Sequence, residues 1–226
     1  MPGGLDENMK YIELCHTVEN GMITYPGDPA VVIDEYMSRE EMREKCGKAA
    51  ALLDRIQMIN TSGTYLDAPF HRFEDGCQIC DIPLEKLVDI PAKVVKLPEK
   101  RRCFEREDVE CAGVPGGAVL LYTGHSKFFG TNKYGDNAPY LTVEGAKCLI
   151  ERGIVFVGID TPLIDRMNSG DCPVHDIILG SGGIVCENMT NLEEILEYES
   201  IYLTAVPPKV KMSSCTARVF VKIKEA

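Results

Sequence analysis

Apolar runs and regular alternation predict several strands in this chain. Residues 118–122 and 154–159 are short, almost unbroken apolar segments, which is typical of strands buried on both faces of a sheet. Residues 201–206 are also rich in strand-forming side chains, and a shorter apolar segment spans 11–14. Residues 217–224 alternate, with aliphatic side chains at the odd positions and mostly charged ones at the even positions. This last strand should therefore have one face in water.

Capping residues predict three helices. Ser38 followed by Glu41 is a capping-box pattern, so a charged helix should cover 38–47. A threonine cap, an apolar face and a closing glycine predict a helix over 142–153. Asn191, with a glutamate three residues later, resembles a third helix start. Few helices among strands of both kinds predict an α/β fold with a mixed sheet.

Length and composition favour a globular protein. The chain has 226 residues, with no internal repeat and no linker-like stretch, so we expect a single domain over 1–226. With 45% hydrophobic residues and no run of about eighteen apolar residues, a membrane is not expected as a partner. No secretory signal is visible and the ten cysteines are expected to be reduced, so the expected location is the cytoplasm.

The charge balance is acidic. The chain has 24 lysines and arginines against 35 aspartates and glutamates, a net charge of −11. That excess argues against nucleic acid as a partner and leaves a small-molecule substrate as the expectation. Only four histidines are available, at positions 16, 71, 125 and 175, so any histidine-based chemistry must use few parts.

Three segments concentrate the polar side chains that can carry chemistry: 60–73 (NTSGTYLDAPFHRF), 158–165 (GIDTPLID) and 175–191 (HDIILGSGGIVCENMTN). Together with Tyr25-Pro26-Gly27-Asp28 and the segment 137–141 (NAPYL), they resemble, in the same order, the cyclase family of metal-dependent hydrolases. That group includes bacterial kynurenine formamidase and isatin hydrolase. The resemblance implies a swivelling β/β/α domain and a homo-oligomer, either a dimer or a tetramer.

The segment 63–71 (GTYLDAPFH) resembles the family signature His-x-Gly-Thr-His-x-Asp-x-Pro-x-His. Thr61 and Tyr65 stand where that signature has its first two histidines, which in the family help to hold a catalytic divalent metal, usually zinc or manganese. A threonine hydroxyl is a weak neutral ligand, and tyrosine must first lose a proton of pKa about 10. The resemblance therefore implies an altered, mononuclear metal site, or none.

The resemblance implies Asp67, His71, His175 and Glu187 as metal ligands. Two imidazoles and two carboxylates suit one zinc or manganese ion. In an extended chain Asp67 and His71 would lie roughly 13 Å apart, too far to share an ion. Pro69 stands between them and predicts a bend that brings both side chains to one point.

Such a site would hydrolyse an amide, formamide or cyclic amide, because a divalent ion acidifies water and polarises a carbonyl. The resemblance gives His71 a part in proton transfer as well as possible ligation, and Glu187 is the alternative base if His71 is a ligand. A metal-free hydrolase with Tyr65 and His71 as acid and base is another hypothesis. The opposing hypothesis is a non-catalytic relative that binds a metabolite or a protein.

Four further residues are candidates for substrate binding. His16, Tyr25 and Pro26 match the opening segment of the family, near the mouth of its active site. His125 follows a Thr-Gly pair close to where the family builds its substrate pocket. An exposed loop histidine is an equal alternative for His125.

Structural roles compete with the functional ones at the candidate ligands. Asp67 could cap local N–H groups in a turn, as aspartate before Ala-Pro often does. Glu187 lies in an apolar segment and needs a partner if buried, either a metal or an arginine. The glycine-rich residues 180–183 are expected to form a tight turn that aims Glu187. The pair Cys77 and Cys80 lacks the second pair of a structural zinc site.

Overall fold

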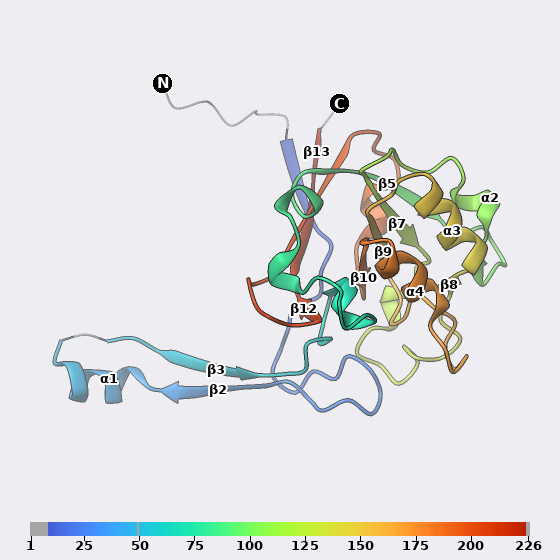
Figure 1. Ribbon diagram of the computed structural model, residues 1–226. Helices are drawn as coiled ribbons and strands as arrows, with labels where there is room; N and C mark the ends of the chain where they lie inside the picture. Colours follow the sequence, from blue (N-terminus) through green and yellow to red (C-terminus); the bar gives the residue numbers. More distant parts are fainter. Residues whose placement is uncertain (1–8, 49, 225–226) are drawn as a thin grey trace, which may run out of the picture.

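The computed structural model describes residues 9–48 and 50–224 (Figure 1). Its main feature is a nine-stranded sheet in the order β1-β13-β11-β5-β7-β9-β10-β4-β12. The strands are β1 (Met9–Glu13), β4 (Tyr65–Asp67), β5 (Ile90–Lys96), β7 (Ala118–Tyr122), β9 (Phe156–Ile159), β10 (Ile184–Glu187), β11 (Ile201–Val206), β12 (Ser214–Thr216) and β13 (Arg218–Lys224). The helices are α1 (Arg39–Cys46), α2 (Arg106–Val109), α3 (Val143–Glu151) and α4 (Pro173–Gly180). Two strand pairs complete the fold: β2 (Val32–Met37) with β3 (Leu53–Gln57), and β6 (Cys103–Phe104) with β8 (Tyr140–Leu141).

The predicted mixed sheet is confirmed. Its centre, β5-β7-β9-β10, is parallel, and the strands on either side pair antiparallel. Helices α2, α3 and α4 lie together against one side of the sheet (Figure 1). Alternate residues such as Val119 and Val157 pack into a cluster with these helices, while Leu120 and Phe156 belong to a second cluster on the other face. The central strands are therefore buried on both faces, as their apolar runs predict.

Most predicted elements have the expected bounds. The strands at 118–122 and 201–206 match β7 and β11, and the alternating segment is β13, with Val219, Val221 and Ile223 buried. The segment predicted at 154–159 forms β9 from Phe156 onward. Local patterns were sufficient here because burial in a sheet repeats with the period of the strand.

Helices α1 and α3 begin at the predicted caps. Ser38 accepts a hydrogen bond from Glu41 N at 3.1 Å, and the Glu41 carboxylate accepts one from Ser38 N at 2.8 Å. Thr142 caps α3 by accepting from Gly145 N at 3.1 Å. Both capping predictions are confirmed.

The helix start predicted at Asn191 is wrong. Asn191 has φ +56°, in the left-handed region, and its side chain caps nothing; instead its Nδ2 donates to Glu13 O at 3.0 Å. Only a short 3₁₀ turn, η5 (Leu192–Ile195), follows it. The residue that caps a helix start needs an extended backbone, which Asn191 does not have. Its side chain is instead held by the bond to the distant β1.

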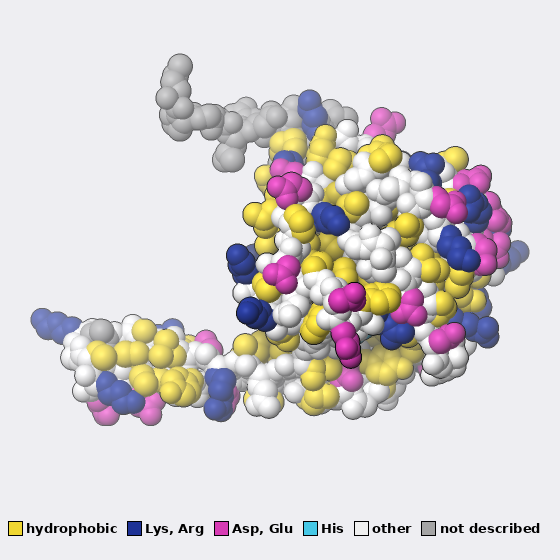
Figure 2. Space-filling view, viewed as in Figure 1, with side chains coloured by type: hydrophobic (Ala, Val, Ile, Leu, Met, Phe, Trp, Pro, Cys, Tyr) yellow, Lys and Arg dark blue, Asp and Glu magenta, His cyan; other side chains and the backbone are white. Residues whose placement is uncertain are grey.

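An arm formed by β2, α1 and β3 extends away from the body, which the sequence patterns do not predict (Figure 1). Every residue of β3 is exposed and α1 has no buried residue. Apolar side chains are visible along the arm in Figure 2, and Tyr36 and Ile56 are 63% and 53% exposed. Of the helices within 9–48 and 50–224, none has the length and apolar character needed to cross a membrane.

Candidate metal centre

Strand register brings four polar side chains together. Tyr65 and Asp67 lie two residues apart on β4 and so point to the same face. On one side Glu187 of β10 lies opposite Tyr65, and on the other Ser214 of β12 lies opposite Asp67. Residues opposite one another in antiparallel strands contact directly, so the sheet alone gathers two carboxylates and two hydroxyls.

Helix α4 adds His175, and Asp165 fixes its orientation. Asp165 accepts hydrogen bonds from Val174 N at 2.8 Å and His175 N at 3.1 Å, which satisfies the first turn of the helix. Its carboxylate is also 2.6 Å from His175 Nδ1. The other ring nitrogen, Nε2, therefore faces the strands, 3.5 Å from Asp67 Oδ2 and 3.4 Å from Glu187 Oε1.

Asp67, His175 and Glu187 offer ligand atoms that all lie within 4.8 Å of one another. Asp67 Oδ1 accepts from Ser214 Oγ at 2.5 Å, but Asp67 Oδ2 is buried without a hydrogen-bond partner in the described chain. An unpaired buried carboxylate oxygen is costly, and a cation would satisfy it. Imidazole with two carboxylates, the imidazole held by a further carboxylate, is a donor set that fits zinc or manganese. We call these three residues the ligand cluster.

His71 lies beside the ligand cluster rather than in it. The predicted bend is confirmed: a 3₁₀ turn, η1 (Pro69–His71), follows β4. It places His71 Nδ1 3.6 Å from Asp67 Oδ1 and 3.0 Å from Ser214 Oγ. A third of the His71 side chain is exposed, and its ring centre is 6.0 Å from that of His175. The fourth predicted ligand is therefore adjacent to the other three, with one side open to solvent.

The alternative of a turn-capping Asp67 is wrong. Asp67 lies in a strand, and its hydrogen bond comes from Ser214, 147 residues away, rather than from local N–H groups. Ser214 binds this carboxylate because β12 pairs directly with β4.

Glu187 is fully buried and has no arginine partner in the part of the chain that the structure describes. It accepts hydrogen bonds from Tyr65 Oη and from Ile164 N, the latter at 2.6 Å. Burial raises the pKa of Glu187 to about 7, with His175 opposing and Asp67 reinforcing the shift. Burial and the charge of Glu187 raise the pKa of Tyr65 well above its usual value, so its hydroxyl stays protonated and donates.

The charge of the ligand cluster favours a cation. Burial by itself would lower the pKa of His175, but the charge of Glu187 and the contacts with Asp165 and Asp67 raise it well above the usual value. Without a metal, a proton on His175 therefore occupies the centre of these carboxylates. A divalent ion would displace that proton, because a histidine ligand must be neutral.

A cavity of about 240 Å³ opens next to the ligand cluster. Its lining includes Tyr25, Thr61, Tyr65, Leu163 and Asn188. Tyr65 reaches Glu187 from the wall of this cavity, so a small molecule bound there lies one side chain away from the carboxylate.

The lining of this cavity does not include the other predicted substrate-binding residues, Pro26, His16 and His125. Pro26 is exposed in the loop beside Tyr25. His16 N donates to Thr64 Oγ1 at 3.0 Å, its ring is stacked on Phe129 with ring centres 3.7 Å apart, and burial lowers its pKa to about 4. His125 is 7% exposed and its Nε2 is 2.7 Å from Tyr134 O, so the exposed-loop alternative is wrong.

Sequence reasoning missed two residues that hold the ligand cluster in place. Asp165 had a signal, since it closes the polar segment 158–165 after a buried strand. Ser214 had none, because only the pairing of β12 with β4 brings it to Asp67. The predicted turn at 180–183 is present: Gly182 has φ +79° and Gly183 N donates to Ile178 O, which ends α4 before β10.

Comparisons with known proteins agree with this architecture. The family model described as "Putative cyclase" matches residues 12–166. Kynurenine formamidase of Bacillus mycoides (strain KBAB4) is 26% identical over 198 residues, covering 86% of this chain and 89% of that protein. The enzyme of the same name from Bacillus anthracis has the same identity and coverage.

Solved structures extend the likeness to three dimensions. A structure described as a potential metal-dependent hydrolase with cyclase activity has a TM-score of 0.75 at 25% identity, covering 96% of this chain and all of the other. Isatin hydrolase A from Labrenzia aggregata shares the fold, with a TM-score of 0.82 at 22% identity over 97% of this chain and 95% of that one. The family model covers more than half of the sequence, and the chain therefore belongs to this cyclase family.

Proposed function

We propose that this chain is a metal-dependent hydrolase that cleaves the carbon–nitrogen bond of an amide, an aryl formamide or a cyclic amide. The observation that carries the proposal is the buried ligand cluster, in which Asp67 Oδ2 lacks a partner and His175 Nε2 is turned toward two carboxylates. The kynurenine formamidase relatives and the structure described as a metal-dependent hydrolase support the reaction class.

Asp67, His175 and Glu187 would hold one zinc or manganese ion, and His71 lies beside them, with Nδ1 3.6 Å from Asp67 Oδ1. Thr61 and Tyr65, at the positions of the two signature histidines, support a mononuclear site. Thr61 lines the cavity, and the Tyr65 hydroxyl is already committed to Glu187. Neither side chain supplies the second set of ligands that a second ion would need.

When bound, a divalent ion would polarise a carbonyl oxygen and make water more acidic. The protein must also take a proton from the attacking water and return one to the departing nitrogen. His71 suits this role, since its side chain is a third exposed and Ser214 Oγ holds its Nδ1, which leaves Nε2 for the proton. Glu187 is less suited, because Tyr65 and Ile164 N already bind its oxygens.

We further propose that the protein acts on a small molecule in the cytoplasm as a single-domain homo-oligomer, a dimer or tetramer. Its net charge of −11 supports a substrate other than nucleic acid. A non-catalytic relative is the alternative, and the Tyr65–Glu187 bond is the observation that favours it, because it occupies a carboxylate that a catalytic metal would need. In that case Thr61→His with Tyr65→His should create hydrolysis that the parent lacks.

Metal analysis of protein purified without chelator tests the main proposal. We expect about one equivalent of metal, and added zinc or manganese at 100 times its dissociation constant should stabilise the protein by about 2.7 kcal/mol. Asp67→Asn should abolish metal binding and aryl formamide hydrolysis together. His71→Asn should retain metal with activity reduced at least about 100-fold, because it removes the proton acceptor.

Asp171→Asn is the matched control, since Asp171 is exposed and outside the ligand cluster. It should bind metal and turn over substrate as the parent does. Metal-free protein whose melting temperature ignores both ions would contradict the proposal.

A further inference from the structure

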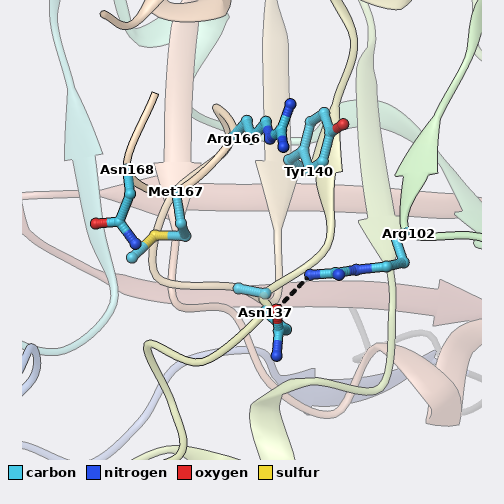
Figure 3. A pocket seen from close by; sticks show the side chains of 7 residues that line it. Arg102, Asn137, Tyr140, Arg166, Met167 and Asn168 are labelled. Atoms are coloured by element: carbon cyan, nitrogen blue, oxygen red, sulfur yellow. Dashed lines mark hydrogen bonds between the residues drawn. The ribbon is translucent and has the colours of Figure 1, made fainter. Parts of the chain in front are cut away.

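A second pocket, of about 350 Å³, adjoins the cavity beside the ligand cluster (Figure 3). Met167 and Asn168 line both spaces, so one loop forms the wall between them. Arg102 reaches this pocket from the segment before β6, and Arg166 from the loop after β9. Tyr140 lies between the two segments in the view of Figure 3, next to Arg166. The metal centre does not use this pocket.

The two arginines differ from most others in the chain. Five arginines have carboxylate partners within 4.0 Å: Arg55, Arg72, Arg101, Arg106 and Arg218. Across 9–48 and 50–224, Arg102 and Arg166 have no carboxylate partner. In a chain with eleven excess acidic groups, two unpaired guanidinium groups lining one pocket make a local positive site.

One side-chain hydrogen bond holds Arg102 at this positive site. Arg102 Nη2 donates to Asn137 Oδ1 at 2.9 Å, which fixes one guanidinium group at the pocket (Figure 3). Among the residues that the structure describes, no carboxylate lines the pocket. A guanidinium presents parallel N–H donors that match the two oxygens of a carboxylate or a phosphate.

The positive site is also connected to the metal centre through the backbone. Arg166 directly follows Asp165, the buried carboxylate that orients His175. Met167 and Asn168 then border the cavity whose wall includes Tyr65. A molecule that spans both spaces would place one end beside the ligand cluster and the other beside the guanidinium groups.

We propose that Arg102 and Arg166 bind an anionic substituent of the substrate, a carboxylate or a phosphate, while the amide lies at the ligand cluster. This inference rests on the proposed hydrolase function and narrows its substrate class to anionic amides. It also assigns Arg166 as a specificity-determining residue, since it contacts the substituent and not the reacting bond.

Three matched substrates test the proposal: neutral formanilide, formanilide with a ring carboxylate, and formanilide with a ring phosphate. The parent should favour an anionic substrate in kcat/KM by about 10-fold to 100-fold, the usual effect of one or two charge-assisted hydrogen bonds. Arg166→Gln should remove at least 10-fold of that preference, because kcat/KM should fall much further for the anionic substrates than for formanilide. The better of the two anionic substrates identifies the substituent.

Arg106→Gln is the control, because it removes one exposed positive charge from neighbouring α2 and should keep the preference. Arg166→Lys keeps the charge but loses the paired donors, so this variant should keep only part of the preference for anionic substrates. An unchanged preference in Arg166→Gln, or an equal fall for neutral and anionic substrates, would overturn the inference. Circular dichroism checks that each variant is folded.

Binding measurements separate this inference from the proposed function. Benzoate and phenyl phosphate are titrated into the protein, with benzyl alcohol as the neutral probe, and observed by NMR. If no formanilide is hydrolysed but an anion binds, and Arg166→Gln weakens it at least 10-fold, the hydrolase proposal fails and the anion site stands. If neither anion binds more tightly than benzyl alcohol, the anion site is refuted even in an active hydrolase.

Discussion

The arm and the buried site around the ligand cluster use similar bonds in opposite surroundings. In the arm the bonds are exposed and close in sequence: Ser38 and Glu41 are three residues apart, and Asp34 pairs with Arg55 across one hairpin. Around the ligand cluster the bonds are buried and distant, as between Ser214 and Asp67. Water can replace a lost partner in the arm but not in the buried site, so the same deletion should have very different costs.

The largest effect is expected for Asp165→Ala. This change leaves His175 Nδ1 and two N–H groups of α4 without their acceptor in a buried place. We expect a loss of about 3–5 kcal/mol in the free energy of unfolding, measured by urea denaturation. Asp165→Asn, which keeps an acceptor but loses the charge, should fall between parent and alanine.

Asp34→Ala is the corresponding change in the arm, where Asp34 binds Arg55 in an exposed pair. Its unfolding midpoint should match that of the parent. Equal losses for Asp165→Ala and Asp34→Ala would show that burial does not distinguish the two regions.

An intermediate effect is expected from His16, whose buried ring nitrogen Nε2 has no hydrogen-bond partner among the described residues. Burial lowers its pKa to about 4 from 6.5, so the folded state resists protonation. The contribution of neutral His16 to the free energy of unfolding is complete above pH 6.5 and is lost as the pH falls through 4. His16→Phe keeps the stack on Phe129 and cannot bind a proton. Between pH 7 and pH 4 its free energy of unfolding should therefore rise by about 2 kcal/mol relative to that of the parent, a value reduced to allow for solvent at the ring.

Urea denaturation of both proteins at four pH values in this window measures that gain. The difference between the two curves isolates His16, because Glu187 titrates in both proteins. The raised pKa of Glu187, about 7, makes both metal-free proteins less stable as the pH rises from 4.5 to 7. Parallel curves would refute the role of His16.

The smallest global effect is expected for Ser38→Ala. Losing the cap should destabilise α1 by about 1 kcal/mol and speed amide exchange there about fivefold. The global unfolding midpoint should not move, because α1 buries no residue. Thr142→Ala removes the same kind of cap from α3, which packs in the body, and should lower the global midpoint. A global loss from Ser38→Ala would mean that the arm unfolds together with the body.

The same contrast explains what the sequence can predict. The α1 cap was predicted because its two residues lie in one turn, and β7 because its burial is continuous along the strand. The arm was missed because β2 and β3 follow no burial pattern that alternation could reveal. The helix start predicted at Asn191 was wrong because a bond to β1, far away in the chain, overrides the local preference of asparagine for a helix cap.

The candidate site depended on resemblance for the same reason. Asp67, His175 and Glu187 come from three separate elements, and no local spacing joins them. The Pro69 bend was predictable, since proline restricts its own backbone. The location of His71 at the edge of the site, and the bond from Ser214, depend on sheet order, which no single segment contains.

The order of the strands also has a consequence for protein synthesis. Among the strands that the structure describes, the early strand β1 has β13 as its one neighbour, and β4 pairs with β12 on one side. While residues 214–224 are still inside the ribosome, the emerging chain therefore carries an open edge at β4 and a strand β1 without its neighbour. Open strand edges pair readily with other chains. The sheet can form in full only after residues 214–224 have emerged, and until then these open edges make the nascent chain prone to aggregation.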